Sequence, residues 1–375
     1  MELCRFTVLI IVLICIGFGY KEDKFVNPYY LFVLTPVTLL MYVDLGGRYF
    51  VTIDVNTWNL AIINMLAFIC GLKFTSDFKT KSIQYGIISE KKAYKHILVL
   101  YALSWVAPFS GPLRNVLPLL STVVVVLAFS TRNKKIILLY TFLVVFKMVV
   151  GHSSKTGVLS TLFAYLISYE YYYITTTKQR IKVLILSLCS VFFMIFAFSF
   201  ANKNRGNYDA KSGLEYYSRD GLDWNLDSRL FLPYMYLETP WINLQYVTRT
   251  QDTRTYGLWA LKPILGYAGL RDDSVYDLIP YSSFNTFTFI SCHFKDFGYY
   301  GSILLSFFLG FFVKKIYSLS NKSPSPFMLG SYVLVAQATL EMFFSNHFFM
   351  QSYPFTICIM MWLYQRVFTK AKKND

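Results

Sequence analysis

The chain has 375 residues, of which 55% are hydrophobic and only 15% charged, and its mean hydropathy is +0.42. This composition excludes an ordinary soluble domain, in which about a quarter of the residues are charged. The formal net charge is +15, but the basic residues are bunched between long uncharged runs and form no patch interleaved with aromatic residues. We therefore expect no nucleic-acid partner.

Apolar runs long enough to cross a bilayer recur along the chain. A run that crosses hydrocarbon has to satisfy its backbone polar groups inside a helix. The pattern predicts an all-α polytopic integral membrane protein, with residues 1–375 as a single membrane domain of about eleven transmembrane helices. The predicted spans begin near Leu3, Pro28, Trp58, Ile97, Val116, Ile136, Thr156, Ile181, Tyr299, Phe327 and Pro354.

The positions of lysines and arginines predict the orientation, because cytoplasmic loops retain positive charge. Alternate connections are basic if the C-terminal "RVFTKAKKND" is cytoplasmic. The predicted inner segments are "YKEDK", 73–95, "TRNKK", "KQRIK", "KKIYSLSNKS" and the tail. This arrangement leaves one long segment, 201–296, as an extracytoplasmic loop.

The six cysteines lie mostly within apolar spans, at no spacing typical of metal ligands. The sequence therefore predicts no disulfide framework and no metal site. We also expect no cofactor.

The long loop contains an aromatic stretch, "RLFLPYMYLETPWINLQYV". Its rings, among them Tyr236 and Trp241, can present apolar faces to the C–H faces of sugars while their polar tips bond to hydroxyl groups. The alternative is an interfacial belt of aromatic residues that only anchors the loop at the membrane surface. The stretch is thus a candidate carbohydrate-binding surface.

The long loop also contains several arginines that could bind a phosphate group. Arg219, Arg229 and Arg271 are candidate phosphate ligands, because a guanidinium group offers a planar fork of donors and stays charged. The alternative is that they form ordinary surface ion pairs with the acidic residues of the loop.

Charged residues at membrane depth complete the candidate set. Lys147 lies near the outer end of its span, Lys155 starts the next span in "GHSSKTG", and Glu341 lies near the outer end of the tenth. Ionisable groups in a membrane tend to face a cavity or a partner. Lys147 can instead snorkel to the headgroups, and Glu341 can pair with it or with a loop arginine. His347 lies on the same predicted side and is a further candidate.

The stretch "NTFTFISCHFKDFGYYG" contains Asp296-Phe297-Gly298, the tripeptide that holds magnesium in protein kinases. A kinase also needs a Gly-rich phosphate loop, a strand lysine and a His-Arg-Asp loop, and the sequence has none of them in the required order. A structural role fits the position better. Asp296 can cap the following helix, and Gly298 and Gly301 can let another backbone approach.

Two short motifs carry a resemblance to a known family. Asn285-Thr286-Phe287-Thr288 followed by Asp296-Phe297-Gly298 resembles the "N-x-(Y/F)-T... D-F-G-x-x-G" pattern of Wzy-type O-antigen and capsule polymerases. Tyr236, Pro240 and Asn243 match a second element, "Y-x-x-x-P-x-x-N". A third, "G-S-R"-like element is altered, because "GHSSK" has Lys155 where the family usually has arginine.

The resemblance implies a glycosyltransferase with a GT-C-like architecture in the bacterial inner (cytoplasmic) membrane. Its substrates would be oligosaccharide repeat units on undecaprenyl diphosphate, joined at the outer interface into O-antigen or capsular polysaccharide. Membrane lipid and a chain-length regulator are the further partners that the resemblance implies.

Two chemical tasks follow from such a transfer. Arg219, Arg229, Arg271 and Lys155 are the candidates for stabilising the departing diphosphate. Glu341, Asp296 and His347 are the candidates for a general base at the acceptor hydroxyl. Two other readings stay open: an O-antigen ligase-like glycosyltransferase and a transporter of lipid-linked oligosaccharide.

Overall fold

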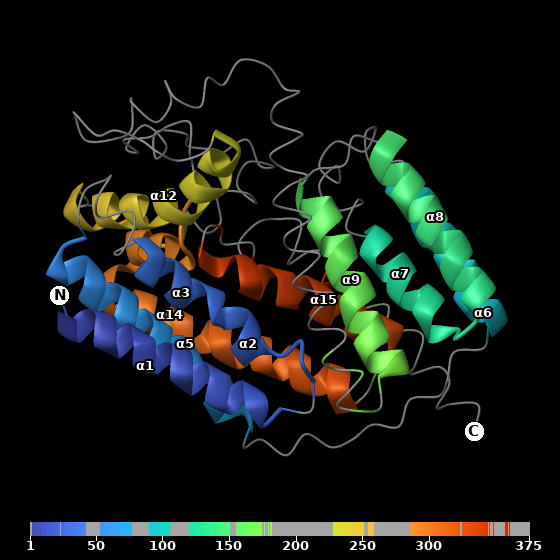
Figure 1. Ribbon diagram of the computed structural model, residues 1–375, viewed down its shortest axis with the longest axis horizontal. Coiled ribbons are helices and arrows are strands. Elements are labelled where there is room, and N and C mark those ends of the chain that lie inside the picture. Colours follow the sequence, from blue (N-terminus) through green and yellow to red (C-terminus); the bar gives the residue numbers. More distant parts are fainter. Residues whose placement is uncertain are drawn as a thin grey trace.

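The computed structural model describes residues 2–22, 24–42, 53–76, 90–105, 120–150, 155–174, 228–250, 254–258, 286–322 and 325–343, together with a few single residues. Every regular element in these ranges is a helix and none is a strand, which confirms the all-α prediction (Figure 1). The elements are α1 (Glu2–Tyr20), α2 (Pro28–Phe32), α3 (Leu34–Met41), α5 (Val55–Ser76), α6 (Glu90–Trp105), α7 (Leu120–Ser130), α8 (Lys134–Val150), α9 (Lys155–Tyr173), α12 (Ser228–Thr250), α14 (Phe289–Lys322), α15 (Pro326–Leu340) and the short 3₁₀ turn η6 (Glu341–Phe343).

Three of the described helices are long and apolar enough to cross a membrane by themselves. They are α1, α5 over Val55–Thr75, and α14. Helices also occupy the predicted spans that begin near Pro28, Ile97, Val116, Ile136, Thr156 and Phe327, although none of these helices meets the same length and hydropathy requirements. The predicted spans from Ile181 and Pro354 lie almost wholly outside the described residues. The number of spans, about eleven, remains a prediction.

The helices form two groups (Figure 1). In one group α1, α5 and α14 lie side by side, and in the other α7 packs against α6, α8 and α9. Helix α15 contacts α14 on one side and α7 and α9 on the other. It is buried along its whole length. An apolar helix that is buried all round is the core element of a bundle.

The crossing of α5 and α14 is unusually close. A Cβ atom at Gly71 would overlap the carbonyl oxygen of Phe307, and one at Gly310 would overlap that of Phe68. Small residues let two helix backbones approach in a membrane, where packing replaces the hydrophobic effect between helices. A buried hydrogen bond from Ser306 Oγ to Asn64 Oδ1 (2.7 Å) ties the same pair of helices.

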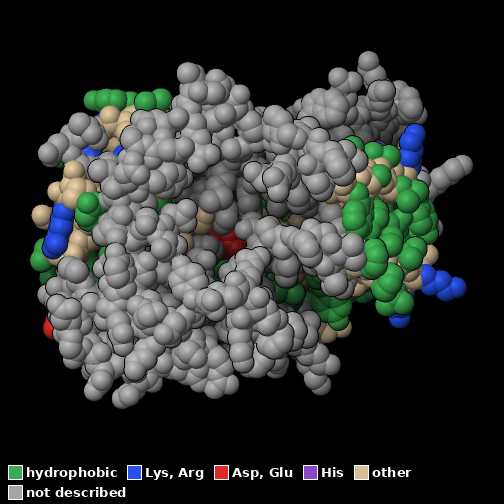
Figure 2. Space-filling view, turned by 90° about the horizontal axis from the view of Figure 1, so that it is seen from above, with side chains coloured by type: hydrophobic (Ala, Val, Ile, Leu, Met, Phe, Trp, Pro, Cys, Tyr) green, Lys and Arg blue, Asp and Glu red, His purple; other side chains and the backbone are tan. Residues whose placement is uncertain are grey.

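Large apolar side chains cover outward-facing parts of the molecule. In Figure 2 they cover the right-hand end, where α6 and α8 lie in Figure 1, with Lys and Arg side chains at the edge. The exposed side chains there include Leu98, Leu103, Leu138, Phe142 and Phe146. Apolar faces of this kind mark contact with a membrane or a partner, which agrees with a membrane protein.

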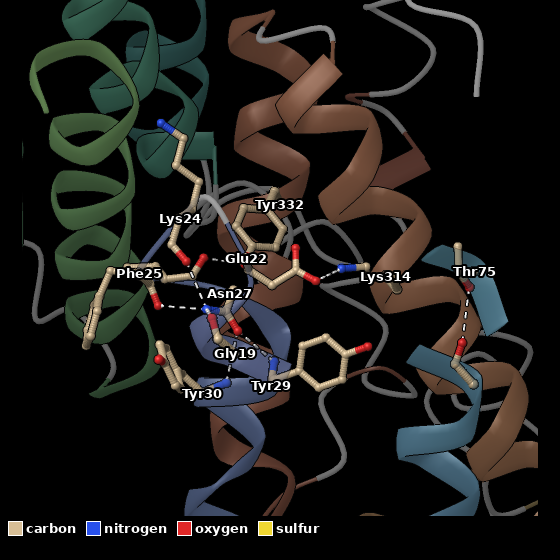
Figure 3. A network of polar contacts seen from close by, with 12 residues as sticks. Gly19, Glu22, Lys24, Phe25, Asn27, Tyr29, Tyr30, Thr75, Lys314 and Tyr332 are labelled. Carbon is tan, nitrogen blue, oxygen red and sulfur yellow. Dashed lines mark hydrogen bonds and ion pairs between the residues drawn. The ribbon is translucent and has the colours of Figure 1, made fainter. Parts of the chain in front are cut away.

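A polar network closes one end of the bundle, which we call the Lys314 end (Figure 3). Lys314 of α14, only 4% exposed, forms an ion pair with Glu22 after α1 and lies over the rings of Tyr29 and Tyr317. The carboxylate of Glu170 in α9 accepts hydrogen bonds from two backbone N–H groups of the turn between α1 and α2. Predicted inner segments from different parts of the chain therefore meet at this end.

Candidate active site at the Glu238 end

Helix α12 lies at the opposite end of α5 and α14, which we call the Glu238 end. Its buried side chain Trp241 donates a hydrogen bond from Nε1 to Thr38 Oγ1 of α3 (3.3 Å). Gln245, one turn further along, accepts one from the backbone N–H of Asp54 (2.9 Å). Pro240 lies inside the helix, where it removes a backbone donor, and α12 is visibly bent (Figure 1).

An ion pair fastens the last turn of α12. Arg249 Nε donates to Asp54 Oδ2 (2.8 Å), just before α5. Partial burial acts to raise the pKa of Asp54, but hydrogen bonds from Thr57 and Arg249 outweigh it and hold this pKa below its usual value. Asp54 also accepts a hydrogen bond from the backbone N–H of Thr57 (2.7 Å) at the start of α5. The Asp54 carboxylate thus caps the start of α5 and binds the last turn of α12.

The two sequence motifs that carry the family resemblance meet here. Asn243 Nδ2 donates to the backbone carbonyl of Thr286 (2.8 Å), and the hydroxyl groups of Thr239 and Thr286 are 2.8 Å apart. All three residues are buried. The element around Pro240 and the element around Thr286, more than forty residues apart, thus form one buried hydrogen-bonded unit.

A third piece of chain docks at a break in α14. Gly298 has φ 69° and ψ −162°, a conformation open almost only to glycine, and it divides the helix just before Tyr299, where a span was predicted to begin. The guanidinium group of Arg254 lies against it, because a Cβ atom at Gly298 would be 3.0 Å from Arg254 Nε. The same guanidinium donates to the Phe294 carbonyl oxygen (3.2 Å) and lies 4.7 Å from that ring's centroid.

Asp296 joins the same contact. Its buried carboxylate accepts a hydrogen bond from Thr255 Oγ1 (2.6 Å), and its carbonyl oxygen accepts one from the Tyr256 N–H (3.0 Å). The predicted close backbone approach at Gly298 and Gly301 is therefore wrong. Gly298 makes room for the Arg254 side chain, and Gly301 makes room for the side chain of Phe297, which lies before the break.

Glu341 lies in η6, directly after α15, and is only 3% exposed. Its Oε1 accepts a hydrogen bond from Gln337 Nε2 (3.1 Å). The turn η6 contacts α3, the helix that also receives Trp241. Glu341 thus follows the helix that occupies the predicted tenth span, and one side-chain partner of its carboxylate is an amide.

Sequence reasoning missed Glu238. Its side chain is fully buried in α12, and among the described residues neither of its carboxylate oxygens has a hydrogen-bond partner. Burial raises the pKa of Glu238 from 4.5 to about 8. A signal was present, because Glu238 is the single acidic residue between Arg229 and Arg249 in a run of aromatic and aliphatic residues.

Of the remaining predicted site residues, only Trp241 has a described side chain. The prediction that Trp241 binds sugar is wrong, because its ring is completely buried against α3, where it anchors α12 and presents no face to a sugar. Arg219, Arg271 and His347 lie outside the described residues. Arg229 and Tyr236 belong to α12 and Lys155 begins α9, but their side chains and that of Lys147 also lie outside the described part of the structure.

The Glu238 end therefore holds three buried carboxyl groups, Glu238, Asp296 and Glu341, together with the guanidinium group of Arg254. Carboxyl groups in a site of low polarity can transfer protons, and a fixed guanidinium group can stabilise a developing anion.

No family model matches the chain, and the searches of curated proteins and of solved structures found no match either.

Proposed function

We propose that this protein is a membrane glycosyltransferase that polymerises oligosaccharide repeat units carried on undecaprenyl diphosphate. The observation that supports this proposal is that the motif elements around Pro240, Thr286 and Gly298 lie together at one end of the bundle. Asn243 bonds to Thr286, and Arg254 lies against the Gly298 break beside Asp296. The motif elements at 236–243, 286–288 and 296–298 thus lie at the same end of the bundle.

The departing group in this reaction is a diphosphate, whose negative charge grows as the glycosidic C–O bond breaks. Arg254 is suited to meet that charge, because its guanidinium plane is held by the Phe294 ring and carbonyl group before substrate arrives. Arg219, Arg229, Arg271 and Lys155 are the further cations that we assign to diphosphate binding.

The proposal places the Glu238 end on the extracytoplasmic face of the bacterial inner membrane. Its support is the charge pattern of the sequence together with the meeting of predicted inner segments at the Lys314 end. Substrate tails would then lie in the bilayer beside the bundle, within reach of α12. The GT-C-like architecture belongs to the same proposal.

Expression in a strain that lacks its own repeat-unit polymerase tests the function. We expect a ladder of polymer lengths on gels, with the G298A variant, matched for protein level, giving much less because Arg254 loses its position. A single repeat unit on the acceptor, or accumulation of lipid-linked units without polymer, would mean that the chain is not a polymerase. Either result would overturn the proposal.

Labelling tests the orientation independently of activity. A tag inserted between residues 203 and 227 should react with a membrane-impermeant reagent in spheroplasts, whereas one after residue 370 should not. Protection of the first tag would place the site on the cytoplasmic side and contradict the proposal.

A further inference from the structure

Glu238 calls for an explanation, because a buried polar group without a partner is costly. Such a group loses its hydrogen bonds to water on burial and gains none in return. The neighbouring polar residues of α12 each form at least one hydrogen bond: Thr239 and Asn243 bond to Thr286, and Gln245 bonds to the backbone of Asp54. Among the described buried side chains of α12, Glu238 is the one that has no hydrogen bond at any of its polar atoms.

Glu238 forms no ion pair with a described residue of the elements packed against α12. Helix α3 has no titratable residue between Leu34 and Met41. Before α5, Asp54 is already paired with Arg249. On α14 the nearby titratable groups are His293, Lys295 and Asp296, and on η6 it is Glu341. A substrate can bring a hydrogen-bond donor to these oxygens, such as a sugar hydroxyl group.

The position of Glu238 in α12 gives it a means of exposure. Pro240, two residues further along, lacks the N–H that would bond to the carbonyl group of residue 236, so the helix is weakest beside Glu238. The helix is anchored on the far side of this point by Trp241 and Arg249. The segment that precedes Pro240 can therefore swing when the contact between Thr239 and Thr286 opens, while the segment that follows it stays in place.

We propose that Glu238 is a catalytic residue of this site: its carboxylate accepts the proton of the acceptor hydroxyl group during glycosyl transfer. The assignment rests on the proposed function. The acceptor oxygen forms a bond to the anomeric carbon, the bond from that carbon to the diphosphate oxygen breaks, and its electron pair leaves with the diphosphate. The hydroxyl proton moves to a Glu238 oxygen and passes to water when α12 opens.

A general base that is shielded from water favours glycosyl transfer over hydrolysis. Water competes with the sugar hydroxyl for the anomeric carbon, and hydrolysis would release the growing chain. A carboxylate that is exposed only when the acceptor enters beneath α12 activates the sugar hydroxyl in preference to water. The buried, unpartnered state seen in the structure is then the resting state of the catalyst.

The test is the E238Q variant, purified in lipid nanodiscs and supplied with lipid-linked repeat units. Glutamine has the same shape as the neutral acid, so we expect the variant to fold and to bind the substrate lipid as wild type does. We expect its rate of polymerisation to fall by at least about 100-fold, the usual contribution of a general base. The E2Q variant is the matched control, because Glu2 is exposed on the N-terminal helix, and it should keep the wild-type rate.

A pH profile separates a chemical role from a structural one. The wild-type rate should rise with pH up to about 8, where Glu238 becomes ionised, and the residual rate of E238Q should lack this rise. E238D, which keeps an acid on a shorter arm, should recover part of the activity.

The outcomes distinguish the two proposals. If wild type makes no polymer, the proposed function fails and the role of Glu238 fails with it. If wild type is active and E238Q stays within threefold of it, or shows the same pH profile, only the assignment of Glu238 is wrong. If E238Q does not fold, the same comparison is made with E238D, whose wild-type rate and profile would overturn the assignment.

Discussion

The two ends of the bundle differ in whether their buried ionisable groups have partners. At the Lys314 end the ammonium group has a carboxylate partner in Glu22 and lies over two tyrosine rings, and Glu170 receives two backbone N–H groups. At the Glu238 end a carboxyl group is buried with neither oxygen paired among the described residues. Paired charges hold helices in one arrangement, whereas an unpaired acid lowers stability and is retained where chemistry needs it.

Removal of the carboxylate at the Lys314 end should have the largest effect on stability. E22Q leaves the buried ammonium group of Lys314 without its ionic partner, and breaking a buried ion pair costs about 3–5 kcal/mol. We expect a large fall in the unfolding midpoint in detergent. The double variant E22Q/K314M, which removes both charges, should recover much of the loss. If E22Q alone is neutral, the pair does not hold this end together.

Substitution of Gly298 should have the next largest effect, at the other end. G298A forces alanine into φ 69° and ψ −162° and brings its Cβ to 3.0 Å from Arg254 Nε. Such backbone strain costs about 1–3 kcal/mol. G17A on α1 is the control, because a Cβ atom there would meet no neighbouring atom. Equal unfolding midpoints for the two variants would contradict the role of Gly298.

An apolar residue at position 238 should stabilise the protein, in contrast to the effect of E22Q. E238L removes a carboxyl group that is buried without a partner, so we expect the free energy of unfolding to rise by roughly 1–3 kcal/mol. Chemical unfolding in detergent measures this change. A destabilised E238L would mean that the carboxyl group has partners and that the contrast between the two ends is wrong.

The pH dependence of stability gives a second measure of the same group. The pKa of Glu238 is about 8 in the folded protein against an ordinary 4.5. The unfolded chain therefore loses this proton first, and stability from Glu238 is complete below pH 4.5 and is lost as pH rises towards 8. The wild-type unfolding midpoint should fall more steeply than that of E238Q across this window. Parallel curves would show that Glu238 titrates normally.

The surface ion pair at the Glu238 end should contribute least. Asp54 and Arg249 are 29% and 51% exposed, and exposed pairs contribute about 0.2–1 kcal/mol. D54N keeps an oxygen that can accept from the Thr57 N–H and loses only the charge. Its effect should be small and should disappear in about 1 M salt, where the screening length is about 3 Å. A loss that is independent of salt would indicate a role beyond the ion pair.

Local patterns in the sequence were sufficient for much of the fold. Apolar runs predict helices because a buried backbone must satisfy its own hydrogen bonds, and described helices occupy the predicted positions from Leu3 to Thr156. These helices depend on neighbours in the chain. The break at Gly298 was not predicted, although glycine alone adopts that backbone conformation at little cost.

The residues of the candidate site were harder to predict from the sequence than the helices. Trp241 has the residue type of a sugar-binding platform, but its burial against Thr38 depends on a contact across about 200 residues of chain. Arg254 was one of several loop arginines, and only its place against Gly298 and Phe294 distinguishes it. Residue types suggested the chemistry, and packing decided which residues are available for it.

By itself the sequence determined an all-helical chain with apolar runs, the motif elements and the expected sidedness, because helix formation, hydropathy and charge are properties of short segments. Only the tertiary structure brought Asn243 to Thr286, placed Arg254 at the Gly298 break and left Glu238 without a partner. The physical reason is that burial and hydrogen-bond pairing are relations between segments that are distant in the chain. A side chain's environment, and with it its pKa and its reactivity, is set by those relations.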